Sequence, residues 1–261
     1  MEKPAYKIAL LGAGNVAWHL APALEKAGHE IVYVYSRTLA NAEALAQNLK
    51  AAQATDQPDF SQTSADLYIM AVKDSALPEL LQAAVFPENS LVAHTSGTLP
   101  LMVFEPYKNI RGAVFYPLQT FSKNTPVSFR NIPFCLETTD ENAMLLLQKT
   151  AGSLSEQVYK VNSEERKILH LAAVFACNFT NHLFGISAEI LQQNHLRFEM
   201  LQPLVEQTVQ KAFSQNPFSV QTGPAIRHDE NTIQTQLQFL QTNPTYQQIY
   251  ELLTRSIQQK S

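Results

Sequence analysis

Charged side chains are scarce in this sequence. Asp, Glu, Lys and Arg make up 16% of the 261 residues, against about 25% in soluble domains generally. The balance is slightly acidic, with 19 Lys and Arg, 23 Asp and Glu, and a net charge of −4. A nucleic-acid-binding protein usually has a basic excess, and this chain has none. We therefore expect no nucleic-acid partner.

Cysteine is scarce as well. The chain has two, Cys135 and Cys177, which fit a reducing cytosol better than a secreted disulfide scaffold. We interpret both as buried, apolar-like side chains rather than nucleophiles or metal ligands. No spacing of His, Cys and Asp indicates a zinc site. Residues 1–7 are polar and show no signal peptide, so we predict a cytoplasmic protein.

Charge is missing altogether from positions 168–188. These 21 residues are long enough to span a bilayer. They also include side chains that hydrocarbon tolerates poorly, namely His170, Asn178, Thr180, Asn181, His182 and Ser187. We therefore predict a helix that is buried inside protein, and no membrane partner.

The first half of the chain alternates between two patterns. Short apolar, β-branched or aromatic runs are typical of strands and occur at 6–11, 31–35, 67–72, 91–94, 113–116, 132–136 and 157–161. Helix-like segments lie between them at 16–26, 39–50, 76–84 and 142–151. This alternation is typical of a parallel sheet with helices on both faces.

Beyond residue 161 the pattern becomes helical. Asn162 and Glu165 are spaced as a capping box at the start of a long helix, which apolar spacing extends through Leu191. Further helices are expected at 196–215, 232–240 and 245–259. The sequence therefore predicts an α/β fold, with a Rossmann-like, mostly parallel sheet in residues 1–161 and an all-α domain in residues 162–261.

The first expected strand runs directly into a G-x-G-x-x-A fingerprint, Gly12-Ala13-Gly14-Asn15-Val16-Ala17. The first glycine permits a tight turn, and the second lets the backbone approach a pyrophosphate. The helix that follows points its N-terminus at the phosphates. Strand, turn, helix and second strand occur at the right distances, so we predict a dinucleotide site that includes Asn15 and Val16. The alternative is a nucleotide-like fold that has lost its ligand.

The end of the second expected strand indicates which dinucleotide. An NAD enzyme would place Asp or Glu there, to hold the ribose hydroxyls. This chain has Ser36, Arg37 and Thr38 instead. Arg37 can pair with a 2′-phosphate, and its neighbours can donate hydrogen bonds. We therefore predict NADP(H), with an ordinary surface charge as the alternative for Arg37.

Polar residues follow three further strands at the same edge of the expected sheet, where ligands bind in open parallel sheets. Val72, Lys73 and Asp74 are expected beside the adenine-side ribose and pyrophosphate, although Asp74 can equally cap a helix. Ser96 is a candidate for contact with nicotinamide or substrate, or a turn cap. Tyr116 and Gln119 are expected to line the substrate pocket.

Seven motifs occur together and in order: the glycine fingerprint, 36–38, 71–74, 94–97, 115–121, 170–178 and 222–229. With them the sequence resembles the NADP oxidoreductases that join a Rossmann-like domain to the domain of unknown function numbered 2520. The N-terminal half is more distantly similar to pyrroline-5-carboxylate reductase and to deazaflavin-dependent NADP reductases. The resemblance implies NADP binding and a dimer-forming helical domain. Members often carry His in place of Tyr116 and Gly in place of His228.

The long helix after Asn162 carries candidates for chemistry. His170 and Asn181 are 11 residues apart and share one face of a regular α-helix, so Asn181 is expected to line the substrate site. His170 is expected to supply or accept a proton, and Asn178 to orient a carbonyl or the nicotinamide amide. Lys167 is a second candidate base. The alternative for His170 is a hydrogen-bonded interior residue.

A polar cluster, 223–229, separates two expected helices. Arg227 is expected to clamp a carboxylate or phosphate of the substrate, and Asp229 to cap the next helix. The alternative is an ion pair between these two side chains that holds the loop.

Two functions remain open from the sequence. The first is an NADP-dependent oxidoreductase that moves a hydride between nicotinamide and a small carbonyl or imine compound in a cleft between the domains. The catalytic candidates are then His170, Asn178 and Ser96. The second is a non-catalytic NADP-binding sensor that acts through its helical domain. Low charge in the long helix also favours a homodimer formed through the C-terminal helices.

Overall fold

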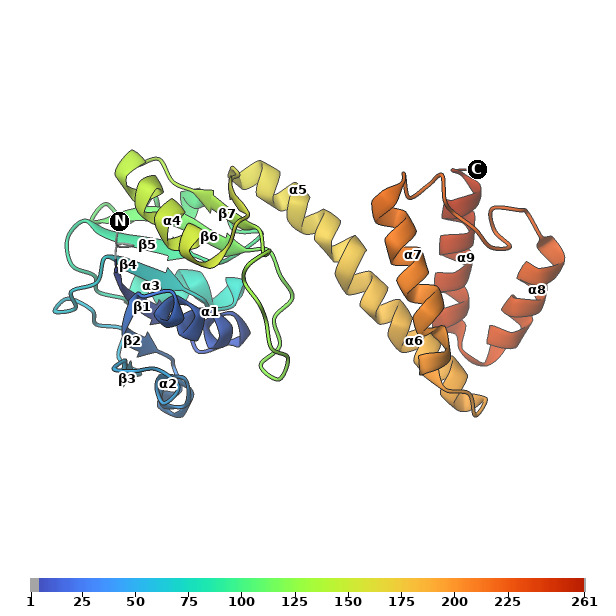
Figure 1. The fold of residues 1–261 in the computed structure, drawn as a ribbon, viewed down its shortest axis with the longest axis horizontal. Coiled ribbons are helices and arrows are strands. Elements are labelled where there is room, and N and C mark those ends of the chain that lie inside the picture. Colours follow the sequence, from blue (N-terminus) through green and yellow to red (C-terminus); the bar gives the residue numbers. More distant parts are fainter. Residues whose placement is uncertain (1–4, 261) are drawn as a thin grey trace. The chain divides into compact units, whose positions relative to one another are not determined.

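The computed structural model describes residues 5–260, and the chain divides into two compact units (Figure 1). Met1–Val174 form the first, called here the sheet unit, and Phe175–Ser261 form the second, called the helical unit. The division falls within the long helix that begins at Ser163. The first turns of that helix therefore belong with the sheet.

The sheet unit is built on eight strands in the order β3-β2-β1-β4-β5-β6-β7-β8, which confirms the predicted Rossmann-like fold. The strands are β1 Lys7–Leu11, β2 Glu30–Tyr35, β3 Gln53–Thr55, β4 Leu67–Met70, β5 Ser90–His94, β6 Ile110–Pro117, β7 Phe134–Glu137 and β8 Val158–Lys160. Neighbours are parallel except for β6 and β7, which are antiparallel. Strand β3 was not predicted, because three residues without an apolar run carry no periodic signal.

Helices bury apolar residues on both faces of the sheet. The helices are α1 Asn15–Lys26, α2 Leu39–Ala46, α3 Leu77–Ala83 and α4 Glu141–Leu154, with short 3-10 helices η1 Asp74–Ala76 and η2 Leu101–Phe104. On one face, Leu20 of α1 and Leu147 of α4 pack into a core with the strands. On the other, Leu77 and Leu81 of α3 pack into a second core. The carboxyl ends of the parallel strands are left free to bind a ligand.

The long helix is not a regular α-helix. It consists of α5 Ser163–Ala173, a π-helical segment η3 Val174–Phe179, and α6 Thr180–Gln193. The predicted capping box is confirmed: Asn162 Oδ1 accepts from the Glu165 N–H at 2.9 Å, and a Glu165 carboxylate oxygen accepts from the Asn162 N–H at 3.0 Å. The π-helical segment widens the turn. The shared face predicted for His170 and Asn181 assumed α-helical spacing throughout, so this interruption removes its geometric basis.

Within the single chain the long helix is mostly exposed, so this chain alone does not provide the burial predicted for it. By length and composition alone, Ser163–Gln193 could cross a membrane, which is weak evidence, and only 6% of its most apolar window is buried. The apolar side chains of Ile168, Leu171, Phe175 and Phe179 are exposed. Cys177 is exposed too, whereas Cys135 is buried as predicted. The apolar spacing predicted the helix correctly, but spacing alone does not show which surface packs against the helix.

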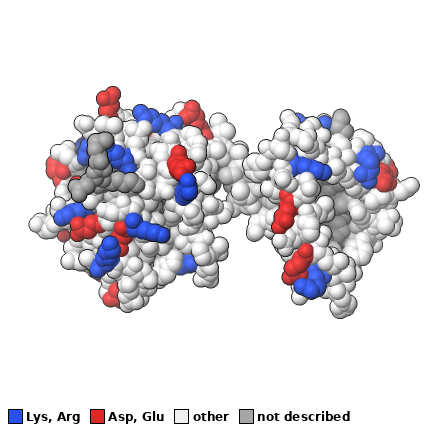
Figure 2. Space-filling model, in the orientation of Figure 1, with Lys and Arg blue, Asp and Glu red and all other residues white. Residues whose placement is uncertain are grey.

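The rest of the helical unit consists of η4 Phe198–Leu201, α7 Gln202–Ser214, α8 Glu230–Phe239, η5 Leu240–Thr242 and α9 Pro244–Gln258. Asp229 caps α8 as predicted, accepting from the N–H and the hydroxyl of Thr232. His228 has φ +53°, a left-handed conformation that favours glycine, which agrees with the glycine expected there in relatives. On the face shown in Figure 2, acidic and basic side chains are interspersed over both units without an extended basic area.

Candidate active site

The glycine turn after β1 has the geometry of a nucleotide-binding loop. Gly12 has φ +121°, and a Cβ at this position would lie 2.3 Å from the carbonyl oxygen of Ala71. Only glycine fits, because both the conformation and the space exclude a side chain. Gly14 is the N-cap of α1, so the free N–H groups of the first helical turn are available to an anion.

A cavity of about 390 Å³ opens beside this turn. It brings together six of the predicted cofactor residues, Gly12, Gly14, Ser36, Arg37, Val72 and Lys73. Lys123, which the sequence analysis did not single out, also lines it, and Glu79 is its acidic residue. Three cations against one carboxylate make this cavity suitable for a ligand with several phosphate groups. We call it the cofactor cavity.

Four predicted cofactor residues do not line the cavity. The Asn15 amide group donates to the carbonyl of Phe121 at 3.0 Å, and Val16 follows it in the first turn of α1. Thr38 is the N-cap of α2, and its N–H donates to the Ser36 hydroxyl at 3.4 Å. Asp74 begins η1 without capping it by its side chain.

Asp74 is engaged with the loop after β5 instead. Its Oδ2 accepts from the Ser96 hydroxyl at 2.9 Å and from the Thr98 hydroxyl. The Ser96 oxygen also accepts from the N–H groups of Thr98, at 3.0 Å, and Leu99, at 2.9 Å. The Ser96 side chain therefore holds a turn together, and its hydroxyl proton is committed to Asp74.

His94, at the end of β5, is a core residue. It is fully buried, its Nδ1 accepts from the Ser96 N–H at 3.1 Å, and its ring stacks on Phe104. Burial, assisted by the nearby Arg166 charge, lowers the pKa of His94 to about 4. The ring is consequently neutral near pH 7 and shapes the strand end without carrying charge.

Tyr116 and His170 meet at the next strand end. The Tyr116 hydroxyl lies 3.2 Å from His170 Nδ1, and the two rings pack edge to face. Gly97 makes room for them, because a Cβ there would lie 2.6 Å from His170 Nδ1 and 2.9 Å from the Tyr116 hydroxyl. Burial raises the pKa of Tyr116 to about 12, so its hydroxyl keeps its proton at neutral pH. The pair is thus equipped to hold and pass a proton.

A buried ion pair fixes the helix that carries His170. Arg166, one turn earlier, is fully buried and pairs with Glu137 at the end of β7. Arg166 also donates to the carbonyl of Leu99, and Glu137 accepts from the N–H and hydroxyl of Ser163. These contacts tie α5 to the sheet. By contrast, the candidate base Lys167 is exposed and pairs with Glu164 at 2.7 Å.

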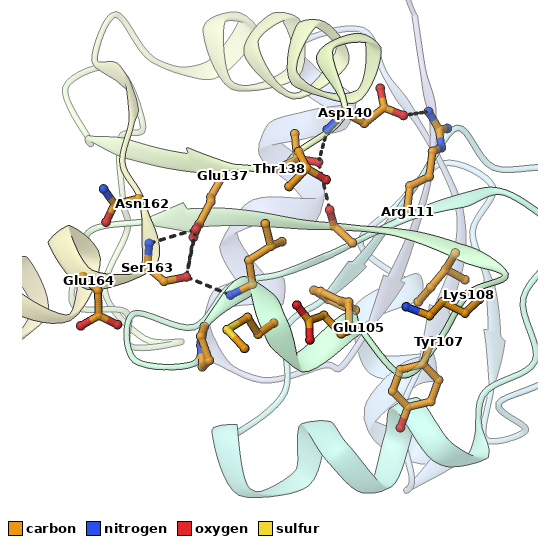
Figure 3. A pocket seen from close by; sticks show the side chains of 17 residues that line it. Glu105, Tyr107, Lys108, Arg111, Glu137, Thr138, Asp140, Asn162, Ser163 and Glu164 are labelled. Carbon is orange, nitrogen blue, oxygen red and sulfur yellow. Dashed lines mark hydrogen bonds and ion pairs between the residues drawn. The ribbon is translucent and has the colours of Figure 1, made fainter.

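A larger cavity, of about 860 Å³, lies elsewhere on the sheet unit (Figure 3). Its lining comes from η2, β6, the end of β7 and the starts of α4 and α5. Some of its polar groups bond to one another, as the dashed lines in Figure 3 show: Ser163 to Glu137, and Arg111 to Asp140 at 3.3 Å. None of the predicted catalytic, cofactor or substrate residues is among those that line this cavity.

The remaining predicted residues are not brought into the cofactor cavity. Gln119 lies just after β6, and its side-chain oxygen accepts from the Thr120 N–H at 2.7 Å. Asn178, Asn181 and Arg227 are exposed residues of the helical unit. Within residues 5–260, no group of three or more His, Cys, Asp or Glu side chains could hold a metal ion.

Three residues of the site were not assigned a role from the sequence. Lys123 gave no signal, because it lies in a loop far from the glycine fingerprint. Arg166 was detectable only as a charge one turn before His170. Gly97 was read as part of a polar cluster, although its importance lies in the side chains that pack against it.

Comparison with known proteins agrees with this geometry. Residues 7–96 match the family model described as NADP oxidoreductase, coenzyme F420-dependent. Residues 132–257 match the domain of unknown function numbered 2520. Among curated proteins, none matches the chain.

Solved structures extend the likeness to the whole chain. A "putative NADP oxidoreductase" from Bacteroides fragilis is 45% identical, with 98% of each chain covered and a TM-score of 0.90. A protein from Thermotoga maritima shares the fold at 21% identity, over 97% of each chain, with a TM-score of 0.67. So does a reductive aminase from Aspergillus terreus, solved with NADPH and ethyl levulinate, at 14% identity over 98% of this chain and 93% of the aminase, with a TM-score of 0.68. The chain therefore belongs to the family of NADP oxidoreductases in which a Rossmann-like domain is joined to domain 2520.

Proposed function

We propose that the protein binds NADP(H) and transfers a hydride between its nicotinamide and a small carbonyl or imine compound. The observation that carries this proposal is the cofactor cavity, in which a turn that admits only glycine lies beside Ser36, Arg37 and Lys73. The end of β2 lacks the carboxylate that would repel a 2′-phosphate. Arg37 can instead pair with that phosphate through two parallel hydrogen bonds.

The position of the proton-transfer pair supports the second half of the proposal. The cofactor cavity lies at the carboxyl ends of β1, β2 and β4, and the Tyr116–His170 pair lies at the ends of β5 and β6. An extended dinucleotide bound across the switch point between β1 and β4 would direct its nicotinamide half toward β5 and β6. The bound nicotinamide would supply or accept the hydride.

The residues of this chain would supply the accompanying proton. When a hydride adds to the carbon of a C=O or C=N group, a proton must reach the oxygen or nitrogen. The Tyr116 hydroxyl, which is protonated at neutral pH, donates it, and His170 replaces it from solvent through its 3.2 Å contact. The substrate class follows from this need, since carbonyl and imine groups take up one hydride and one proton together. Asn178, Asn181, Gln119 and Arg227 remain predicted substrate contacts.

Cofactor choice is tested by titrating NADPH and NADH against the wild type and Arg37→Ala, with nucleotide fluorescence as the readout. We expect the wild type to prefer NADPH by at least about tenfold, which corresponds to about 1.4 kcal/mol. Arg37→Ala should weaken the binding of NADPH and leave the affinity for NADH nearly unchanged. Equal affinity of the wild type for both nucleotides would overturn the assignment of Arg37.

Catalysis is tested by NADPH oxidation against a panel of small keto acids, aldehydes and imines. With the first active compound, Tyr116→Phe should lower kcat by a factor of about 10² or more, the usual size of general acid catalysis. His170→Gln should lower kcat less and flatten its pH profile. If NADPH binds but no compound is reduced and both variants bind it normally, the non-catalytic sensor is the correct function.

We also propose that the protein is a cytoplasmic homodimer that covers the exposed helices with a second copy. Of the nineteen large apolar side chains exposed in the described residues, fourteen lie beyond Ser163. The polar residues Asn178, Asn181 and His182 on the long helix favour a protein partner over lipid. Sedimentation should give twice the mass of the chain without detergent. A monomer that partitions into liposomes would overturn this proposal.

A further inference from the structure

We infer that Lys123 binds the pyrophosphate of the cofactor and is delivered by a loop fastened across the first helix. The loop, residues 118–133, connects β6 to β7 and is called here the strap; it is the green loop beside α1 in Figure 1. The inference rests on the proposed function, because it assumes that a dinucleotide occupies the cofactor cavity.

Two side chains of α1 fasten the strap. Asn15 donates through Nδ2 to the carbonyl of Phe121 at 3.0 Å. One turn later, His19 Nε2 lies 2.8 Å from the carbonyl of Ser122, so this ring nitrogen carries the proton and donates. The His19 ring also stacks on Phe121, with the centroids 5.8 Å apart. Consecutive residues of the strap are thus held against the first two turns of α1.

Lys123 is the next residue of the strap, and its side chain lies over α1 at the edge of the cofactor cavity. Its ammonium lies 4.5 Å from the ring centroid of Trp18 on α1, a favourable contact between a cation and an aromatic face. Trp18 itself donates its backbone N–H to the Gly14 carbonyl at 2.9 Å. Lys123 also lines the cofactor cavity together with Gly14. Lys123 therefore borders the cavity at the glycine turn, near the N-terminus of α1, where a pyrophosphate would bind.

In this arrangement, Arg37 and Lys123 are placed for different phosphate groups of the cofactor. Arg37, at the end of β2, is placed for the 2′-phosphate, which only NADP(H) carries. Lys123, at the glycine turn, is placed for the pyrophosphate, which NAD(H) and NADP(H) share. Asn15 belongs to the glycine fingerprint, but its side chain holds the strap.

The first test measures dissociation constants of NADPH and NADH for Lys123→Met, which keeps the length of the side chain and removes its charge. We expect both constants to rise about tenfold, as for loss of one charge-assisted contact, with a shallower salt dependence. Lys108→Met is the matched control, an exposed lysine that lines the larger cavity, and should change neither constant. Unchanged affinity in Lys123→Met, or a loss confined to NADPH, would overturn the assignment.

The second test is a double-mutant cycle between Asn15→Ala and Lys123→Met. If Asn15 acts by holding the strap, Asn15→Ala should weaken NADPH binding when Lys123 is present. The same substitution should have little further effect on NADPH binding in the Lys123→Met variant. Additive losses would mean that Asn15 contacts the cofactor directly, which contradicts the strap. Failure of the wild type to bind either nucleotide would instead contradict the proposed function itself.

Discussion

In the sheet unit, apolar side chains form two cores, one on each face of an eight-stranded sheet. In the helical unit, only Ala225, Ile233 and Thr254 are buried among residues 175–260. Both units contain amphipathic helices with clear caps. The difference is that the helices of the first pack on a sheet in the same chain, while those of the second leave large apolar side chains open to solvent.

The stability of each unit depends on the surface that its helices pack against. Helices in proteins gain most of their stability from burying an apolar face rather than from propensity. Large exposed apolar patches are typical of interaction surfaces. The apolar side chains of the sheet unit are therefore covered within the chain, whereas most large apolar side chains of the helical unit are not, which is the basis of the proposed dimer.

The largest expected effect comes from the core of the sheet unit. Phe115 of β6 is fully buried and packs against Phe134, with ring centroids 5.0 Å apart. Phe115→Ala should lower the free energy of unfolding by about 3–5 kcal/mol, since it leaves a cavity. Phe213→Ala, at a side chain that is 90% exposed, should cost no more than about 0.5 kcal/mol in the same transition. Urea unfolding measures both, and equal losses would mean that the units share one core.

A smaller effect is expected at the start of the long helix. Arg166→Met leaves the Glu137 carboxylate without its partner in a buried site and should cost about 3 kcal/mol. Lys167→Met, the neighbouring residue in an exposed pair with Glu164, should cost less than about 1 kcal/mol. Urea unfolding of the two variants compares adjacent cations on one helix. Similar small losses would show that α5 is not anchored to the sheet as described.

The smallest effect on the single chain is expected at the exposed aromatic pair of the helical unit. Phe175 and Phe179 are exposed and pack edge to face on each other. Replacing both with Glu should leave the sheet unit folded but weaken self-association by about tenfold or more, since it puts charge into an apolar contact. Met102→Glu is the matched control, because Met102 is similarly exposed but lies in the sheet unit. Sedimentation across a concentration series measures the strength of self-association. Equal weakening of self-association by both changes would contradict an interface confined to the helical unit.

Much of the fold was predictable because its signals are local. Alternating apolar runs and glycine breaks predicted seven of the eight strands, and the spacing of Asn162 and Glu165 predicted a capping box that the structure contains. The glycine fingerprint placed the cofactor cavity for the same reason, since turn, helix N-terminus and strand end lie within a few residues of one another.

The parts that escaped prediction depend on residues far apart in the sequence. Asn15 and Phe121 are 106 positions apart, and Tyr116 and His170 are 54 apart. No local sequence pattern predicts such contacts. The π-helical segment escaped for a different reason, because regular apolar spacing cannot reveal where the hydrogen-bond register of a helix widens.

Backbone sterics and apolar periodicity act over short stretches of chain. The succession of strands and helices along the chain, the glycine turn and the polar residues at the strand ends were therefore predictable from the amino acids alone. Which of those residues come into contact depends on how the chain packs. This packing buried Arg166 and left its neighbour Lys167 in water, turned Asn15 toward the strap, and left the long helix uncovered. Burial and long-range contacts are properties of the packed chain, so local sequence patterns do not reveal them.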